Sequence, residues 1–318
     1  MKALVTGTAG FIGSHLAKRL LSDGFEVVGI DCFNDYYPVA IKENNLASFR
    51  QNKNFNLIKG DILDLELSET LKGVDYVFHE AAQPGVRASW GSSFPLYIRN
   101  NIAVIQKLLE VLKSQKIKKM IFASSSSVYG DSRQCPIREN VIPRPISPYG
   151  VTKLAAENLC YLYYKNYDIP VVSLRYFTVY GPGQRPDMAF NGFIRSLIRN
   201  EEIPIYGNGE QTRDFTYISD VISANIGALD DRCLPGEIFN VGGGANISIN
   251  GAIKMLEDIS GKKAKVKYYE PQKGDILHTA ADISKARSTF GYNAKVGIRD
   301  GLANEYKWLQ NLAQKVKE

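Results

Sequence analysis

Short apolar runs recur along the chain, separated by longer stretches in which the apolar positions follow a helical spacing. Short continuous apolar runs are typical of strands that are buried on both faces of a parallel sheet. They predict strands at 2–5, 26–30, 55–58, 76–79, 120–123, 171–174 and 237–241, with helices between them, for instance at 11–21 and 98–112. This alternation predicts right-handed βαβ units and therefore an α/β fold with a doubly wound parallel sheet.

Two stretches of the chain, 180–215 and 245–318, are less regular and richer in proline, glycine and charged residues. We assign them to a second, smaller α/β lobe. The predicted organisation is a main domain at 1–178, to which residues 214–242 return, and a lobe formed by 179–213 and 243–318.

The 318 residues carry 39 basic and 33 acidic side chains, a net charge of +6 that is mixed along the chain. This balance suits a small anionic ligand better than nucleic acid. The four cysteines and three histidines lie far apart, so no metal site is predicted, and free thiols are typical of a reducing cytoplasm. No leader segment and no apolar run of about 18 residues is visible, so we expect a soluble cytoplasmic protein with no membrane partner.

A glycine-rich turn joins the first predicted strand to the first predicted helix. Gly7, Gly10 and Gly13 form a G-x-x-G-x-x-G pattern that includes Phe11 and Ile12. Glycines let the backbone turn tightly and approach a pyrophosphate, and the helix N-terminus offers unpaired N–H groups to the phosphates. The turn predicts a Rossmann-type dinucleotide site in the main domain, against the alternative of an ordinary tight loop.

Acidic residues follow the second and third predicted strands. Asp31 stands 18 residues after Gly13, where a carboxylate binds the adenosine ribose hydroxyls and repels a 2′-phosphate, so NAD is favoured over NADP. Asp61 and Ile62 follow the third strand and suit the adenine edge, although Asp61 alone could equally be a solvated turn residue.

Tyr149 and Lys153 form a Tyr-x-x-x-Lys pair, and residues i and i+4 share one face of a helix. Because a nearby ammonium stabilises a phenolate, we expect Lys153 to lower the phenol pKa of Tyr149 by roughly three units. Tyr149 would then accept a proton from a substrate hydroxyl near neutral pH. A run of four serines at 124–127 follows an apolar strand, at the sheet edge where ligands bind.

Taken in order, these motifs resemble the extended short-chain dehydrogenase/reductase family, and within it the nucleotide-sugar 4-epimerases. The resemblance spans essentially the whole chain and also rests on Asn100-Asn101, Arg175-Tyr176-Phe177 and Arg213-Asp214-Phe215. It implies bound NAD, catalysis by Tyr149 with Lys153, and Ser125 as their hydroxyl partner. The cofactor site that it implies consists of Gly7, Gly10, Phe11, Ile12, Gly13, Asp31, Asn34, Asp61, Ile62, Asn101, Tyr149, Lys153 and Tyr176.

The segment 206–215 resembles the family loop whose arginine meets the phosphates of a UDP-sugar, and that arginine is Arg213, two residues after Gln211. Arginine suits phosphate because its contacts are charge-assisted. Asp275 resembles the acid that holds the uridine ribose. Hexose epimerases often carry a second phosphate arginine three residues before that acid, where this chain has Gln272, with Lys273 adjacent.

The residues after Ser125 separate the reactions that share this scaffold. Dehydratases of the family carry an acidic pair there and uronate decarboxylases carry a glutamate, whereas this chain has Ser126 and Ser127. The resemblance therefore favours simple 4-epimerisation. In that reaction Tyr149 takes the O4 proton while C4 gives a hydride to NAD, the 4-keto sugar turns over, and the hydride returns to the opposite face.

The segments 34–37, 83–87 and 178–188 resemble the UDP-glucuronate 4-epimerase branch, and Thr178 stands where many galactose-type epimerases have asparagine. A uronate adds a C6 carboxylate, which favours cationic and hydroxyl partners. The alternatives are a UDP-glucose/UDP-galactose 4-epimerase, of narrow or broad sugar specificity, and a catalytically silent NAD-binding sensor. For Arg87 and Arg185 the alternative is a structural role, in which they cap loops or pair with the other lobe. The candidate partners of the carboxylate are Arg87, Ser126, Ser127 and Arg185.

The helical segments 94–114 and 149–167 carry many apolar and aromatic residues, and family members often dimerise through this pair as a four-helix bundle. We expect a homodimer, against the alternative that these faces pack only on the sheet. The predicted partners are therefore a UDP-sugar and a second copy of the chain.

Overall fold

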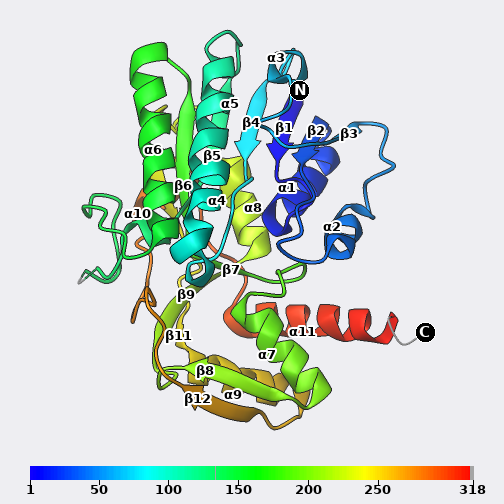
Figure 1. The fold of residues 1–318 in the computed structure, drawn as a ribbon, viewed down its shortest axis with the longest axis vertical. Helices are drawn as coiled ribbons and strands as arrows, with labels where there is room; N and C mark the ends of the chain where they lie inside the picture. Colours follow the sequence, from blue (N-terminus) through cyan, green and yellow to red (C-terminus); the bar gives the residue numbers. More distant parts are fainter. Residues whose placement is uncertain (133, 316–318) are drawn as a thin grey trace.

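The structure, a computed structural model, describes residues 1–132 and 134–315. At its centre lies a sheet of seven parallel strands in the order β3-β2-β1-β4-β5-β6-β10 (Figure 1). The predicted doubly wound parallel sheet is confirmed, and the strand ends lie within two residues of the predicted ones. The strands are β1 (Lys2–Thr6), β2 (Glu26–Asp31), β3 (Phe55–Lys59), β4 (Tyr76–His79), β5 (Lys119–Ser125), β6 (Val171–Tyr176) and β10 (Ile238–Val241).

Alternate residues of the central strands serve two separate hydrophobic layers. In β1, Ala3 and Val5 belong to a layer with Leu16 of α1 (Phe11–Ser22), whereas Leu4 belongs to a layer with Leu108 of α5 (Val104–Leu112). Side chains alternate along a strand, so both faces of the sheet are buried beneath helices. These helices are α1 (Phe11–Ser22), α2 (Val39–Leu46), α3 (Leu67–Thr70), α6 (Pro148–Tyr167), α8 (Ile218–Gly227) and α10 (Ser284–Phe290), together with α5.

The helix predicted at 98–112 is not a uniform α-helix. A short helix, α4 (Phe94–Tyr97), runs directly into a π-helical segment, Ile98–Ala103, which continues as α5 (Val104–Leu112). Tyr97 and Val104 on either side of the π-helical segment are both buried, so the hydrophobic pattern alone reads as one α-helix. π-Helical turns are often found at functional sites.

The remaining elements form a smaller α/β part with its own core, in the lower half of Figure 1. Phe190, Ile203 and Leu256 belong to this core, which is separate from the two layers of the central sheet. Three strands pair in the order β11-β9-β7, and β12 pairs with β8. The elements are β7 (Thr178–Tyr180), α7 (Ala189–Arg199), β8 (Glu202–Tyr206), β9 (Thr212–Tyr217), β11 (Asn246–Ser248), α9 (Ile249–Ser260), β12 (Lys265–Tyr269) and α11 (Ile298–Lys315).

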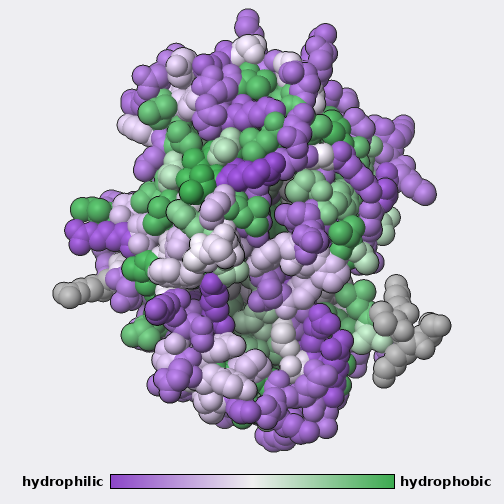
Figure 2. Space-filling view, viewed as in Figure 1, coloured by the Kyte–Doolittle hydropathy of each residue, from purple (hydrophilic) through white to green (hydrophobic). Residues whose placement is uncertain are grey.

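Hydrophobic side chains also reach the surface of the larger part. Figure 2 shows them (green) interspersed with hydrophilic residues over the region of α5 and α6. Large exposed hydrophobic residues of this region are Leu96 in α4, Ile98 in the π-helical segment, and Val151, Tyr161, Leu162 and Tyr167 on α6. None of the helices in the described part of the chain has both the length and the apolar composition that a membrane crossing requires.

Candidate active site

The glycine-rich turn between β1 and α1 forms a close backbone cradle. Gly7 has a φ of +68°, in the left-handed region, and a Cβ on Gly13 would collide with the Gly7 carbonyl oxygen. The N-cap of α1 is Gly10, with no capping side chain and no acid in the first turn, so the N–H groups at this end remain open to an anion. The cradle therefore fits a diphosphate.

Asp31, at the end of β2, is buried and held by its own chain. Its Oδ2 accepts a hydrogen bond from the Ala9 N–H at 3.0 Å, and its Oδ1 accepts one from the Phe33 N–H at 2.8 Å. Lys42 on α2 lies 3.9 Å from Oδ1 and donates to the carbonyl and side-chain oxygens of Asn34 at 2.8 and 2.7 Å. Sequence reasoning missed Lys42, because nothing in the local pattern distinguishes a buried helical lysine from an exposed one.

Asp61 and Ile62 lie further along the same cleft, beyond β3. The Asp61 carboxylate accepts a hydrogen bond from the Leu63 N–H at 2.9 Å and pairs with Arg99 at 2.6 Å. Partial burial raises the pKa of Asp61, but these two donors outweigh burial and hold the pKa below its usual value. Asp61 is therefore an ionised carboxylate engaged by Arg99, and Ile62 supplies apolar surface beside it.

Tyr149 and Lys153 lie one turn apart on α6, and both line the cleft. The Lys153 ammonium donates to the Ala123 carbonyl at 2.6 Å, and burial lowers its pKa to about 8. Burial raises the pKa of Tyr149, and a hydrogen bond with Ser125 and the charge of Arg185 offset this only in part. The prediction that Lys153 lowers the pKa of Tyr149 is therefore wrong for the protein alone, because the ammonium is turned toward Ala123 and burial of the phenol dominates.

Contacts at the start of α6 and in its middle fix this pair. Ser147 caps the helix by accepting a hydrogen bond from the Gly150 N–H at 3.1 Å. One turn beyond Lys153, Glu157 forms a buried ion pair with Arg175 of β6. The same carboxylate accepts a hydrogen bond from Ser124 of β5 at 2.7 Å. The helix is thus tied to two central strands next to the lysine.

The four serines after the apolar strand have different surroundings. The Ser124 hydroxyl donates a hydrogen bond to Glu157. Ser125 forms a hydrogen bond with Tyr149 and accepts another from the Ser127 N–H at 3.2 Å. Ser126 and Ser127 begin a 3₁₀ turn and are partly exposed. Ser125 therefore reaches the tyrosine, and the two following hydroxyls lie just beyond the end of β5.

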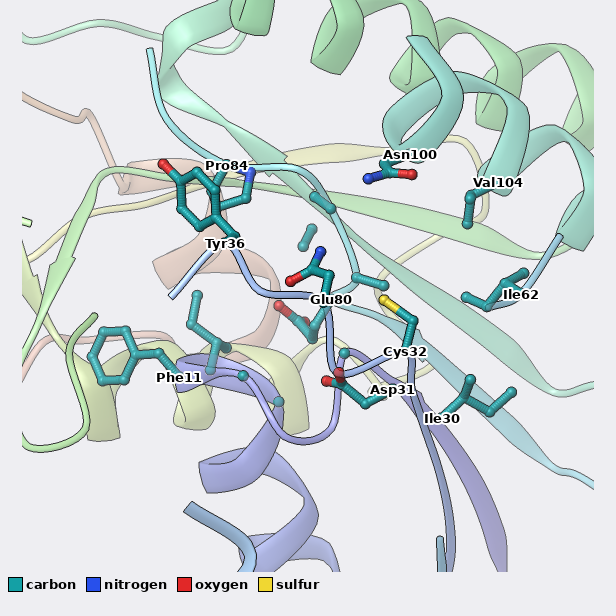
Figure 3. Close-up of a pocket in the computed structure, with 18 of the residues that line it drawn as sticks. Phe11, Ile30, Asp31, Cys32, Tyr36, Ile62, Glu80, Pro84, Asn100 and Val104 are labelled. Atoms are coloured by element: carbon teal, nitrogen blue, oxygen red, sulfur yellow. The ribbon is translucent and has the colours of Figure 1, made fainter. Parts of the chain in front are cut away.

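One cleft gathers most of the residues predicted to hold the cofactor (Figure 3). Asn101 does not line it, because its side-chain amide bonds the backbone of Gln83 at 2.6 and 3.1 Å and the Thr152 hydroxyl at 3.0 Å. Its neighbour Asn100, on the same π-helical segment, lines the cleft instead. The predicted cofactor residues along the wall are Gly7, Gly10, Phe11, Ile12, Gly13, Asp31, Asn34, Asp61, Ile62, Tyr149, Lys153 and Tyr176.

A second set of predicted residues lies together outside this cleft. Arg87 pairs with Asp275 at 2.9 Å and stacks over the ring of Tyr206, 4.3 Å from the ring centre. Burial lowers the pKa of Arg213, and the charges of Asp275 and Arg87 act on it in opposite directions. Gln211 donates to the Tyr206 carbonyl at 2.9 Å. Two guanidinium groups and one carboxylate therefore share one polar region.

The neighbour of Arg213 anchors its strand. The buried carboxylate of Asp214 accepts hydrogen bonds from the Gly243 N–H at 2.7 Å and the Ala281 N–H at 2.9 Å. Because side chains alternate along β9, fixing Asp214 on the inner face places Arg213 on the other face.

Arg185 lines the main cleft together with Tyr149. Its guanidinium pairs with Asp187 through two N···O distances of 3.0 and 3.1 Å. The sequence predicts that Arg87 and Arg185 meet one substrate group. In the structure Arg185 lines the main cleft, whereas Arg87 is not among the residues that line it and pairs with Asp275. Thr178 is the first residue of β7 and is partly exposed.

Sequence reasoning also missed Tyr97 and Glu80. The Tyr97 ring packs edge-on against Tyr149, with 6.4 Å between the ring centres, and its hydroxyl donates to two backbone carbonyls of the loop after β4. Glu80 follows an apolar strand, as the two predicted acids do, so the same positional rule could have found it; Tyr97 carries no such signal. Within the described residues, no group of three or more potential metal ligands converges.

Comparison with known proteins agrees with this geometry. Residues 3–242 match the NAD dependent epimerase/dehydratase family. A Bacillus subtilis protein named as an uncharacterized UDP-glucose epimerase, YtcB, is 45% identical over 99% of both chains. The UDP-glucuronate 4-epimerase of Thermodesulfobacterium geofontis is 40% identical over 99% of this chain and 98% of its own.

A crystal structure of the UDP-glucuronic acid 4-epimerase from Bacillus cereus, in complex with UDP-glucuronic acid and NAD, is also similar. It is 48% identical, covers 98% of this chain and 100% of its own, and has a TM-score of 0.96. The family resemblance drawn from the sequence is thereby confirmed. The chain belongs to the NAD dependent epimerase/dehydratase family, within the extended short-chain dehydrogenases/reductases.

Proposed function

We propose that this protein is a UDP-glucuronate 4-epimerase that uses NAD. The observation that carries the proposal is that Tyr149, Lys153 and Arg185 line the same cleft as the glycine cradle. This cleft provides a base, a cation beside it and a second cation suited to a sugar carboxylate. The names of two similar proteins, which specify UDP-glucuronate or UDP-glucuronic acid, support the choice of sugar.

The residues along the cleft fit NAD. The backbone cradle at Gly7 and Gly13 suits the diphosphate, and Asp31 suits the adenosine ribose hydroxyls. When bound in its oxidised form, NAD supplies a hydride acceptor for the sugar C4 and a positively charged ring. Lys42 beside Asp31 is already engaged by Asn34, so the carboxylate keeps its preference against a 2′-phosphate.

Tyr149 is the proposed acid–base group. Its phenol oxygen takes the proton from the sugar O4 and later returns it, and the Ser125 hydroxyl orients that oxygen by a hydrogen bond. Because burial raises the pKa of Tyr149, the phenolate needs positive charge nearby, and this chain offers Lys153 and Arg185.

Arg185 is the proposed partner of the C6 carboxylate. Its Nε and one terminal nitrogen face Asp187, and the remaining N–H donors of the guanidinium fork are those that a substrate would use. Ser126, Ser127 and Thr178 are the proposed hydroxyl partners around the sugar.

Arg213 and Arg87 are the proposed partners of the UDP diphosphate. Burial lowers the pKa of Arg213, and the charge of Asp275 opposes this only in part. Asp275 also pairs directly with Arg87, so both guanidinium groups face one region. Gln272 and Lys273, the residues near the position of the usual second arginine, are exposed. We therefore assign the second phosphate cation to Arg87, with Asp275 and Gln211 at the uridine end.

A UDP-glucose/UDP-galactose 4-epimerase is the second candidate. Asp187 already balances the charge of Arg185, which favours a neutral C6 hydroxymethyl group more than an unpaired arginine would. The name of the Bacillus subtilis relative supports this alternative. A silent NAD-binding sensor is disfavoured because both Tyr149 and Lys153 are present.

The test is an assay of the purified protein with UDP-glucuronate and UDP-glucose side by side, with product separation by chromatography. We expect epimerisation of UDP-glucuronate with the higher kcat/KM. The Tyr149→Phe variant should lose activity by about 10² or more, the usual scale of acid–base catalysis, and keep its NAD. Turnover of UDP-glucose alone would replace the uronate assignment, and full activity of Tyr149→Phe would remove Tyr149 from the reaction.

We also propose a homodimer that forms through the helical segments 94–114 and 149–167, the first of which contains α4, the π-helical segment and α5. The support is the set of exposed apolar residues on these helical segments, which include Ile98, Tyr161 and Leu162. Sedimentation of the wild type and of a Tyr161→Glu/Leu162→Glu double variant tests this. We expect a dimer and a monomer, respectively.

We further propose how the chain is divided into domains and where the protein is located. The NAD-binding domain is 1–178, with 214–242 returning to it, and the UDP-sugar-binding lobe is 179–213 with 243–318. We place the protein in the cytoplasm, and its four cysteines are free thiols, which suits a reducing compartment.

A further inference from the structure

Glu80 is a carboxyl group in the middle of the cleft for which the proposed reaction has no role. It directly follows β4 and lines the cleft with Lys153, Tyr149 and Tyr176. Figure 3 shows it between the start of α1, at Phe11, and the helical residues on the opposite wall. Its Oε2 is buried and, among the described residues, has no hydrogen-bond partner. A buried polar atom without a partner is rare enough to require an explanation.

The surroundings of Glu80 orient donors toward its carboxylate. Asn225, which is fully buried, donates from its Nδ2 to the Tyr176 hydroxyl oxygen at 2.8 Å. The same nitrogen donates to the Val221 carbonyl at 2.9 Å, which fixes the amide. The single hydroxyl proton of Tyr176 has two acceptors within reach, Glu80 Oε1 at 2.9 Å and Asn225 Oδ1 at 3.0 Å. Because the Asn225 amide already donates to the Tyr176 oxygen, we assign this proton to Glu80. This donor chain stabilises the charged carboxylate more than the neutral acid.

Lys153 on α6 is the cation that acts on Glu80. Burial raises the pKa of Glu80 to about 7, and both the Tyr176 hydroxyl and the charge of Lys153 counteract burial. In return, Glu80 is the strongest of the charges that oppose the burial-induced drop in the pKa of Lys153. Glu157 and Cys160 on α6 act on Lys153 more weakly.

The other titratable groups near Glu80, namely His79, Tyr176 and Tyr149, do not supply a negative charge in its place. His79, its neighbour on β4, is turned to Thr6 of β1 at 2.8 Å, and burial lowers its pKa to about 3, so it is neutral. Burial raises the pKa values of Tyr176 on β6 and Tyr149 on α6, so both phenols are neutral in the protein alone.

We propose that Glu80 is a positioning residue of the epimerase site, the buried counter-charge that keeps Lys153 in its ammonium form. The inference rests on the proposed function, in which the ammonium of Lys153 supports the phenolate of Tyr149. Without the carboxylate, Lys153 would remain buried beside a carbonyl and lose its proton at a lower pH. Catalysis would then lose its cation on the alkaline side of neutrality.

Two variants separate charge from hydrogen bonding. Glu80→Gln removes the charge and keeps an acceptor for the Tyr176 hydroxyl, whereas Glu80→Met removes both at similar size. The first measurement is the pKa of Lys153 in the NAD-loaded protein, from an NMR titration with labelled lysine and a Lys153→Arg variant to assign the signal. We expect this pKa to fall by roughly half a unit to one unit in both variants.

The second measurement is the pH profile of kcat for UDP-glucuronate. We expect its alkaline limb to move to lower pH by the same amount in both variants, with unchanged folding in a thermal melt. An unchanged Lys153 titration in both variants would overturn the proposal, as would a change confined to Glu80→Met, which indicates a structural hydrogen bond. If the wild type does not act on UDP-glucuronate, the proposed function fails, and the lysine titration still decides the role of Glu80.

Discussion

The cofactor side and the sugar side of the cleft are built in different ways. On the cofactor side, close backbone packing at Gly7 and Gly13 and buried hydrogen bonds to Asp31 form the site before any ligand arrives. On the sugar side, two of the three candidate arginines already have acidic partners of their own, in the pairs Arg185–Asp187 and Arg87–Asp275. A preformed cradle binds without rearrangement, whereas a self-paired arginine must share its charge with the substrate. The cofactor side should therefore tolerate few substitutions. Substitutions on the sugar side should instead change the preference between sugars by graded amounts.

The largest effect is expected where the backbone is packed most closely. Gly13→Ala places a Cβ against the Gly7 carbonyl oxygen, so the cradle must open and the protein should be purified without NAD and without activity. Gly192→Ala is the matched control, because Gly192 lies inside α7 and a Cβ there meets no atom within 4 Å. The control should keep NAD and gain up to about 1 kcal/mol of stability. NAD content by absorbance and a thermal melt measure both, and a Gly13→Ala protein with full NAD would contradict the preformed cradle.

The next effect concerns the sugar side. Arg185→Ala leaves the C6 carboxylate of UDP-glucuronate without its charged donor, a loss of about 1.5–3 kcal/mol. This corresponds to a roughly 10- to 150-fold drop in kcat/KM for UDP-glucuronate. UDP-glucose has a neutral group at C6 and should be affected less, so the ratio of kcat/KM for the two substrates is the measurement. An equal loss for both would make Arg185 a structural residue of its loop.

A smaller effect is expected at the ribose end of the cofactor side. Asp31→Ala removes the acceptor for ribose hydroxyls and the charge that repels a 2′-phosphate. The buried ammonium of Lys42, 3.9 Å from the carboxylate, then faces the same place. We expect NAD to bind roughly tenfold more weakly and NADP to bind more tightly than in the wild type. Calorimetric titration with both cofactors measures this, and a double variant that also carries Lys42→Met should lose the gain in NADP affinity.

The two sides also differ in how far the sequence predicts them. The central strands and the glycine turn follow from short-range patterns, because apolar runs, glycine spacing and an acid after a strand reflect local backbone geometry. Glu80 also stands at the end of an apolar strand, as Asp31 does, so the same local pattern could have predicted it. The hydrogen bonds of Asn101 depend on a π-helical turn that the apolar pattern does not register. The other features of the site depend on long-range contacts. Arg87 pairs with Asp275, which is distant from it along the chain. The burial that raises the pKa of Tyr149 likewise depends on segments that are distant in the sequence.

The smallest effect on catalysis, and a clear one on stability, is expected at Glu305 of α11. This carboxyl is fully buried and accepts a hydrogen bond from the Gly181 N–H at 2.8 Å, in the loop that leads to Arg185, so the sugar side is held by a titratable group. Burial raises the pKa of Glu305 from 4.5 to about 8. The native state thus holds a proton that the unfolded chain has released, and the resulting stability is fully present below pH 4.5 and is lost as the pH rises toward 8.

Glu305→Gln keeps an acceptor for Gly181 and does not titrate. The variant should match the wild type near pH 5 and exceed it by about 2–4 kcal/mol near pH 8. Urea unfolding at both pH values measures the difference, and a pH-independent difference would show that Glu305 is not protonated in the native state.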